Sequence, residues 1–591
     1  MSQQENNNMQ KHFYRASAAD FDKMPGSPIG YWVSKEILNT FSQKPISSVA
    51  KTRVGCQTSD NNRFLRLWHE VSARRSKYDS SAKEEAESST FKWFPYNKGG
   101  SYRKWFGNNE YVINWENAGK DVFAYAKSLY GSPTRTVKNG AFYFRSSVTW
   151  SKISSGIPSF RWQPEGAIFD VAGASVFLDS RVEEYALLAQ LNSSVVLEQL
   201  KIISPTLNYE TSHIASLPAI FNVADKEILF NKVTSLISNS KIDWDMYETS
   251  WNFQCSPLIK NKFPKIYESY QALDEEKCKL VEEQRKLESE INSLICKEFG
   301  VAVPVSVELN TLSLYANSAF RYESAMALER LKSDTIGELL SYSIGCMMGR
   351  YSLDREGLVY AHAGNDGFKA LVEEGAYATF AADEDGILPL TSDNWFPDDV
   401  AARFEQFVRT VWGAETLEEN LQFIADSLCL AAIKPVKKGG ETARETIRRY
   451  LSTQFFKDHL KTYKKRPIYW LFSSGKEKAF ECLVYLHRYN EATLPRMRTE
   501  YVTPLLGQMA GRIDRLRLQQ AEAGTAEAKR IGKDIDSLTK QLTELRAFDD
   551  ELKHHADMRI TLDLDDGVKV NYGKFGTLLS EVKAITGDKG E

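Results

Sequence analysis

The stretch that decides the fold runs from Val54 to Phe177 and mixes aromatic, basic and amide side chains. It opens with Val54-Gly55-Cys56-Gln57-Thr58-Ser59-Asp60-Asn61-Asn62-Arg63, continues through Trp93-Phe94-Pro95-Tyr96-Asn97-Lys98-Gly99-Gly100 and Tyr102-Arg103-Lys104-Trp105, and reaches Thr149-Trp150-Ser151-Lys152. Short apolar runs separated by Gly, Asn, Ser and Pro are typical of strands joined by long loops. The stretch therefore predicts a mixed α/β domain whose loops carry the polar chemistry.

The same stretch is basic, although the whole chain is slightly acidic. Residues 51–170 contain 19 Lys or Arg against 11 Asp or Glu, a balance of +8, whereas the 591-residue chain has a net charge of −3. Six of the twelve tryptophans lie in this window. Basic side chains displace the counterions of DNA, and aromatic rings between them offer stacking platforms. The alternative is a twisted sheet with Trp and Tyr in its core and Lys and Arg on a solvated face.

The rest of the chain reads as helical, so we expect an α+β protein. The predicted domains are a polar lead-in and junction at 1–28, a mixed α/β DNA-binding domain at 29–243, a long helical arm at 244–304 and a mainly α C-terminal domain at 305–591. Helices are expected at 181–192, 226–238 and 266–299. Leucines recur every seven residues from Leu273 to Leu294, but Lys277, Gln284 and Glu298 interrupt the companion seam. This pattern favours an arm that packs within its own chain over a homodimeric coiled coil.

The C-terminal part gives further expectations. Helical sequence runs from 309 to 348, where Gly345 and Gly349 allow close helix packing, a helix starts at about Asp399, and a charged helical pair spans 506–557. The acidic loop 383–400 suits a helix N-terminus, with a divalent cation as the alternative. The basic residues 464–466 precede a buried strand, and they either touch phosphates or form a solvated turn. Residues 562–575 are predicted to be an extended tail with a turn at Asp566-Gly567.

Several classes of protein are excluded by missing patterns. No apolar run approaches a membrane span and residues 1–12 are polar, so we expect a cytoplasmic protein without a signal peptide. The seven cysteines form no C-x-x-C pair and the eight histidines show no ligand spacing, so no metal site is predicted. None of the eighteen prolines neighbours another, which rules out the Asn/Asp-Pro-Pro-aromatic loop of amino methyltransferases. No Gly-x-Gly cofactor turn follows a strand. We therefore predict no catalytic and no cofactor-binding residues in this chain.

Six segments resemble a known family. They are Asp20 to Ser34, Gln57-Thr58 with Asn61 to Phe64, Pro95 to Gly100, Gly345 to Ser352, Lys465 to Trp470 and Asp565 to Val568. Together they resemble the PglX-type adenine-specific DNA methyltransferases of the bacterial BREX phage-exclusion systems. In that family the cofactor turn and the Asn-Pro-Pro-aromatic loop lie upstream of the segment that matches Phe21. The resemblance thus implies the target-recognition and C-terminal helical regions alone, as a truncated product or as one half of a split enzyme.

The resemblance implies methyl transfer from S-adenosylmethionine to adenine N6 in double-stranded DNA, with the cofactor bound by the complete enzyme and not by this chain alone. The expected partners are DNA and a catalytic half or other BREX proteins, without a membrane. Arg pairs with guanine and Asn or Gln with adenine, whereas Lys and Arg elsewhere hold phosphates. Base contacts are expected from Gln57, Asn61, Arg63 and Arg145, and phosphate contacts from Lys98, Arg103, Lys104 and Lys152. The alternative is a free-standing DNA- or partner-binding regulator or remnant without enzymatic activity.

Overall fold

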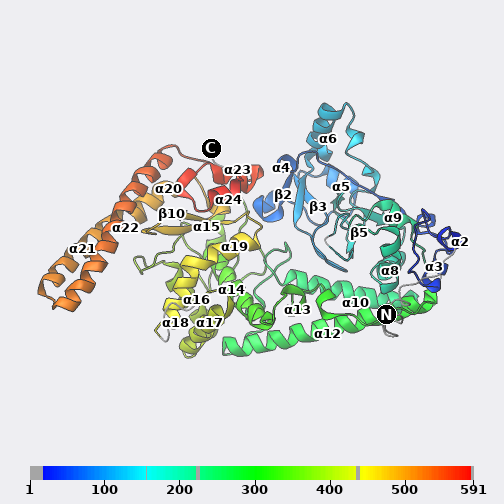
Figure 1. Cartoon of the computed structure of the whole chain (residues 1–591). Helices are drawn as coiled ribbons and strands as arrows, with labels where there is room; N and C mark the ends of the chain where they lie inside the picture. Colours follow the sequence, from blue (N-terminus) through cyan, green and yellow to red (C-terminus); the bar gives the residue numbers. More distant parts are fainter. Residues whose placement is uncertain (1–17, 155, 221–225, 434–439, 588–591) are drawn as a thin grey trace, which may run out of the picture. The chain divides into compact units, whose positions relative to one another are not determined.

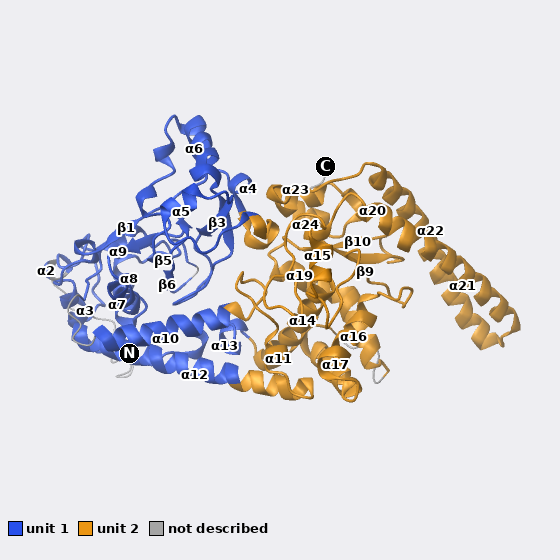
Figure 2. Cartoon of the chain, turned by 180° about the vertical axis from the view of Figure 1, so that it is seen from behind, with its two compact units in different colours: residues 1–65, 75–244, 276–323 blue, residues 66–74, 245–275, 324–591 orange. Residues whose placement is uncertain are grey.

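The computed structural model describes residues 18–154, 156–220, 226–433 and 440–587 (Figure 1). The chain divides into two compact units: unit 1 consists of residues 1–65, 75–244 and 276–323, and unit 2 of residues 66–74, 245–275 and 324–591 (Figure 2). Many helices accompany three small sheets, so the α+β prediction is confirmed. The units are not consecutive stretches of chain, in contrast to the predicted domains. Folding of each unit therefore requires contacts between residues far apart in sequence.

Two sheets form the framework of unit 1. The first has the strand order β1-β8-β5-β6, with all neighbours antiparallel. Its strands are β1 (Lys51–Arg53), β5 (Ser147–Trp150), β6 (Phe160–Gln163) and β8 (Ser175–Phe177). In the second sheet, β3 lies between antiparallel β4 and parallel β7. These strands are β3 (Trp93–Asn97), β4 (Tyr111–Asn114) and β7 (Ile168–Phe169), and β2 (Leu65–Leu67) lies where the chain passes into unit 2.

Helices cover both sheets of unit 1. They are α2 (Ala18–Phe21), α3 (Lys35–Thr40), α4 (Asn61–Phe64), α5 (Lys83–Ser88), α6 (Glu116–Tyr130), α7 (Arg181–Leu191), α8 (Ser194–Ile203), α9 (Thr211–Ser216), α10 (Lys226–Asp245), α12 (Ile266–Phe299) and α13 (Ser318–Arg321). One core joins the first sheet to α7, α8, α10 and α12, and a second joins β3, β4 and β7 to α6. The predicted helices at 181–192, 226–238 and 266–299 are confirmed.

The long helix α12 packs within the chain, as its interrupted seam indicated. Its residues 276–299 are coloured with unit 1 in Figure 2. Ile291 and Ile295 enter the core of unit 1, and the polar residues Gln284, Glu288 and Asn292 are also buried. Buried polar groups need partners, so Gln284, which interrupts the companion seam, fits a site within its own unit, as do Glu288 and Asn292.

Unit 2 is built around the antiparallel sheet β10-β11-β9. The strands are β9 (Ile387–Pro389), β10 (Tyr469–Ser473) and β11 (Glu481–Tyr485). The helices are α11 (Pro257–Lys260), α14 (Ala327–Met347), α15 (Phe368–Glu373), α16 (Val400–Trp412), α17 (Leu417–Ala431), α18 (Ala443–Tyr450), α19 (Phe456–Thr462), α20 (Thr493–Arg496), α21 (Thr503–Glu522), α22 (Thr525–Asp557), α23 (Gly567–Gly573) and α24 (Val582–Thr586). One hydrophobic core unites the sheet and these helices.

Most C-terminal predictions are confirmed, but the helical run expected from 309 to 348 is a long helix only over Ala327–Met347, and the predicted tail is wrong. The helical pair, the buried strand after residue 466 and the helix after Asp399 are all present, and Asp399 caps α16 by accepting from the amides of Ala401 and Ala402. The extended tail is wrong, because α23 occupies 567–573. Val568 and Tyr572, one turn apart, are both fully buried, so packing favours a helix over the predicted turn.

Gly345 shows the close packing expected of it. A Cβ at this position would lie 2.5 Å from the Tyr351 ring and 3.0 Å from the Tyr469 hydroxyl.

Two further observations concern membrane spans and metal sites in the described part of the chain. None of the helices in the described part of the chain is long and apolar enough to cross a membrane. Within the four described ranges, no group of three His, Cys, Asp or Glu residues could hold a metal ion.

Candidate DNA interface of unit 1

Three loops meet at one end of the first sheet: residues 98–100 after β3, the loop that begins at Ser151 after β5, and residues 170–174 between β7 and β8. Asn97 holds them together. Its Nδ2 donates to Thr149 Oγ1 at 2.6 Å, and its Oδ1 accepts from the Gly99 amide at 3.2 Å. The Gly100 amide donates to Ser151 Oγ at 3.0 Å, which ties the loop after β3 to the loop after β5. Asn97 was not among the predicted site residues. Its position before two glycines at the end of a strand was the available signal.

The loop of residues 170–174 approaches residues 97–99 so closely that position 173 requires glycine. A Cβ on Gly173 would lie 2.4 Å from the Asn97 carbonyl oxygen and 2.8 Å from the Gly99 nitrogen. Backbone atoms cannot move aside as a flexible side chain can. The loop residues 97–100 therefore depend on a small residue at 173.

Replacing Gly173 by alanine should lower the free energy of unfolding of unit 1 by about 2–3 kcal/mol through overpacking. The loss is measurable by native-state hydrogen exchange at the amides of β3 and β5. Gly140→Ala is the control, because its Cβ would meet only the Tyr143 ring at 3.7 Å. Equal protection in the two variants would contradict the packing argument.

Lys98 and Lys152 lie on these joined loops. Lys98 is half-buried with its Nζ 4.8 Å from the centre of the Tyr111 ring. Burial lowers the pKa of Lys98, and nearby Asp170 opposes that shift. Lys152 Nζ lies 2.9 Å from Glu210 Oε1. Both ammonium groups are thus held in place by neighbouring side chains.

A second group of predicted contacts lies around α4. Asp60 caps this short helix by accepting from the Arg63 amide at 3.0 Å, and Asn61 and Arg63 are exposed. The Thr58 hydroxyl donates to Asn61 Oδ1 at 2.7 Å. Arg63 lies over the Tyr125 ring at 4.8 Å. Gln57 is exposed on the preceding loop, where its backbone amide bonds to Thr136 O.

Arg145 is held apart from both groups. Its Nη2 donates to Leu178 O at 3.3 Å and lies 3.7 Å from Asp179, and its guanidinium lies over Phe142 and Phe177. The structure thus joins Lys98 to Lys152 and Gln57 to Asn61 and Arg63, while Arg145 is positioned by its own neighbours.

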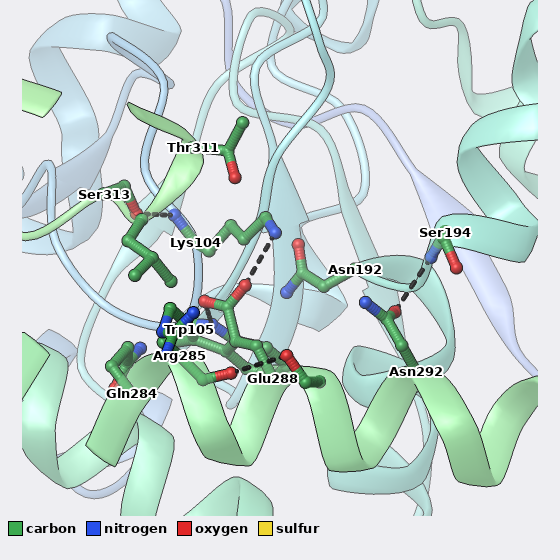
Figure 3. Close-up of polar contacts among 12 residues, drawn as sticks. Lys104, Trp105, Asn192, Ser194, Gln284, Arg285, Glu288, Asn292, Thr311 and Ser313 are labelled. Atoms are coloured by element: carbon green, nitrogen blue, oxygen red, sulfur yellow. Dashed lines mark hydrogen bonds and ion pairs between the residues drawn. The ribbon is translucent and has the colours of Figure 1, made fainter. Parts of the chain in front are cut away.

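Arg103 and Lys104 do not fit their predicted role. Arg103 is 1% exposed, and its Nη1 donates to Asp243 Oδ2 at 3.2 Å and to Ser313 O at 2.7 Å. Lys104 Nζ donates to Glu288 Oε2 at 2.8 Å, and Trp105 Nε1 donates to the other carboxylate oxygen at 2.7 Å (Figure 3). The prediction that these two cations contact phosphates is corrected, because both are buried in ion pairs with α10 and α12.

Neighbouring groups keep Lys104 charged inside the protein. Burial by itself would lower the pKa of Lys104, but the Glu288 carboxylate and Tyr102 together hold the pKa above its ordinary value. The lysine therefore stays charged and serves α12 as an anchor. Figure 3 shows a second anchor on the same helix, where Asn292 Oδ1 accepts from the Ser194 amide.

The buried tryptophans agree with the alternative prediction, a twisted sheet with Trp and Tyr in its core. Trp93, Trp105, Trp115 and Trp150 are fully buried, so their rings are not stacking platforms in this structure. The predicted contact residues that remain accessible lie instead on the loops and on α4.

Unit 1 is therefore a basic α+β module with conformationally fixed loops at one end of a sheet, and α12 is anchored to it. No protein-family model matches the chain. Over 579 residues, 97% of its length, the chain is 50% identical to the protein named adenine-specific methyltransferase BrxX of Escherichia coli O9:H4 (strain HS), of which it covers 46%. It is 37% identical over 574 residues to the adenine-specific methyltransferase PglX of Lacticaseibacillus casei (strain Zhang), of which it covers 45%. The chain spans about half the length of these relatives.

Proposed function

We propose that this chain is the DNA-recognition half of a site-specific adenine-N6 DNA methyltransferase of a bacterial anti-phage (BREX) system. The observation that carries the proposal is the similarity over 97% of the chain to a protein named as an adenine-specific methyltransferase. Because the chain covers 46% of that protein and contains no adjacent prolines, the base-holding loop of the proposed enzyme would come from another polypeptide segment. Its substrate would be double-stranded DNA, which places its work in the cytoplasm.

The cofactor of the proposed reaction, S-adenosylmethionine, does not fit this chain. Nucleotide-like cofactors bind at the carboxyl ends of parallel strands in open α/β sheets. In the described ranges the strands of the first sheet pair antiparallel, β3 pairs antiparallel with β4 and parallel with the short β7, and the sheet of unit 2 is antiparallel throughout. No methyl-transfer step is assigned to residues of this chain, and the catalytic half would hold the cofactor.

The proposed DNA contacts are the predicted residues that remain accessible. Gln57, Asn61, Arg63 and Arg145 would contact base edges, each worth roughly 1–3 kcal/mol of discrimination. Lys98 and Lys152 would hold phosphates, which fixes the duplex on the loops joined by Asn97. Neighbouring rings, carboxylates and a helix cap already hold Lys98, Lys152 and the α4 residues in place. Little side-chain entropy is therefore lost when they bind DNA.

An exposed apolar segment supports the need for a catalytic partner. Ile29, Tyr31 and Trp32 are all large and well exposed, and the Tyr31 and Trp32 rings lie edge to face at 5.0 Å. Exposed aromatic clusters are typical of protein–protein contacts. This segment is proposed to bind the catalytic half.

The decisive experiment is methylation calling by long-read sequencing in a bacterial host without its own BREX system. N6-methyladenine at one short asymmetric motif is expected when the chain is co-expressed with the catalytic half encoded at its own locus, and not when either is expressed alone. Methylation by the chain alone would contradict the proposal. If no methylation appears with both, while the purified chain binds duplex DNA, the free-standing regulator or remnant takes its place.

A further inference from the structure

Lys51 and Arg53, which were not among the predicted DNA contacts, lie on one face of strand β1. This strand stands at the edge of the first sheet, next to β8. Lys51 pairs directly with Phe177 of β8, and Arg53 pairs with Ser175. Directly paired residues of antiparallel strands share a face of the sheet, and so do residues two positions apart on one strand. The side chains of Lys51, Arg53 and Phe177 therefore point to the same side of the sheet.

Two aromatic rings hold two arginines on this face. The ring centres of Phe142 and Phe177 lie 4.8 Å apart. The Arg53 guanidinium lies 5.3 Å from the centre of the Phe142 ring, and the Arg145 guanidinium lies 5.6 Å from the same ring centre and 5.9 Å from that of Phe177. A guanidinium that lies over a ring keeps its N–H groups at its edge, where they can donate to an anion. Lys51, Arg53 and Arg145 thus form a basic face around one pair of rings.

Little negative charge offsets the basic face. Arg53 Nη1 donates to the Thr52 carbonyl oxygen at 2.9 Å, and in the described part of the chain neither Lys51 nor Arg53 forms an ion pair. Asp179 lies 3.7 Å from Arg145 Nη2, but its side chain is fully exposed, so water and salt screen its charge. Like charges gathered in this way favour an anionic ligand.

The basic face continues across the sheet to the candidate DNA interface. Ser175 of β8 pairs with Arg53 on one side and with Thr149 of β5 on the other. Thr149 Oγ1 in turn accepts from Asn97 Nδ2, which holds together the loops that carry the predicted phosphate contacts. A duplex bound at those loops would therefore lie next to the basic face.

We propose that Lys51 and Arg53 hold phosphates of the DNA backbone beside Arg145, a positioning role that rests on the proposed function. Lys and Arg release the counterions of DNA, and their phosphate contacts fix the register of a protein on the duplex without reading its sequence. A lysine on an edge strand also prevents pairing with another chain. That role requires no pair of arginines over one ring, whereas phosphate binding accounts for the lysine and for the arginines together.

The test measures the Kd of the full 591-residue chain for a random-sequence DNA duplex at several NaCl concentrations. The double variant Lys51→Gln with Arg53→Gln should lower the slope of log Kd against log NaCl concentration by about 1.8, because each phosphate contact contributes about 0.9. Lys51→Gln alone should lower the slope by about 0.9. This single change removes an exposed ammonium group and leaves the arginines on their rings, so folding does not depend on it. The charge-conserving variant Lys51→Arg with Arg53→Lys should keep the wild-type slope.

Lys201→Gln with Lys241→Gln is the matched control, because it removes two exposed cations from the same unit. These lysines lie on α8 and α10, which share a core with Val148 and Val176 on the opposite face of the sheet. The control should keep the wild-type slope, and an equal loss of slope in the control would contradict a contact specific to the basic face. A wild-type slope in both glutamine variants would overturn the phosphate contacts and leave the proposed function standing. If the wild type binds no duplex, DNA recognition itself fails, and the role of Lys51 and Arg53 fails with it.

Discussion

Replacing Asp243 by alanine should lower the free energy of unfolding of unit 1 by about 3–5 kcal/mol, the usual cost of leaving one member of a buried ion pair alone. Asp243 is fully buried, and besides Arg103 it accepts from the amides of Tyr315 and Ala316 at 2.7 Å each. Its removal would leave a buried guanidinium and two amides without their acceptor. Native-state hydrogen exchange at the amides of β5 and β6 measures this loss without interference from unit 2.

A double-mutant cycle separates charge from packing. The pair Arg103→Met with Asp243→Ala should be less destabilised than the sum of the two single variants, because no buried charge remains. Asp179→Ala is the surface control, since that carboxylate is fully exposed beside Arg145 and should give no measurable change. Additive effects of Arg103→Met and Asp243→Ala would contradict a direct ion pair.

The second large effect concerns pH and the buried histidines of unit 2. Burial lowers the pKa of His459 and of His487 to about 3, and Arg350 adds to the shift in both. Burial also lowers the pKa of His69. In the unfolded chain imidazole binds a proton below about pH 6.5. Stability is therefore complete above pH 6.5 and falls as the pH drops toward 3, by about 1.4 kcal/mol per pH unit and histidine.

Glu248 has the opposite effect on the pH dependence of stability. Burial raises the pKa of Glu248 to about 7, against the effects of Arg350 and of Tyr463, whose hydroxyl donates to it at 3.0 Å. A carboxyl group with a raised pKa favours the folded state at low pH, and that contribution is lost as the pH rises from about 4.5 to 7. The net pH profile of unit 2 is therefore a difference of opposing effects, and a single histidine has to be isolated by substitution.

His487→Gln isolates one histidine. Glutamine Nε2 can keep the hydrogen bond that His487 Nε2 makes to His69 O at 2.9 Å, but it cannot be protonated. Between pH 6.5 and 5 the wild type should lose about 2 kcal/mol more stability than this variant. Denaturant-dependent oxidation of Met497, buried in unit 2, reports the unfolding at each pH. His554→Gln on exposed α22 is the control, and parallel pH profiles of wild type and His487→Gln would refute the assignment.

The local sequence pattern was sufficient to predict the long helices and the buried strand of unit 2. The sequence by itself predicted α12 with its bounds, the helical pair α21 and α22, and the buried strand β10, because periodicity and apolar runs are properties of neighbouring residues. It also identified the loops that carry Lys98 and Lys152, since glycine and asparagine after an apolar run indicate a loop. The similarity to the relatives rests on the same linear information.

Only the tertiary structure decided which polar residues are accessible for binding. Arg103 and Lys104 read as surface cations, yet their carboxylate partners lie 140 and 184 residues further along the chain. The tail after residue 562 became a helix because Val568 and Tyr572 are buried in the core of unit 2. A backbone bridge joins Ile153 to Asn208, although 55 positions separate these residues in the sequence. Pairing across such separations depends on the global packing of the chain, and no local pattern in the sequence encodes it.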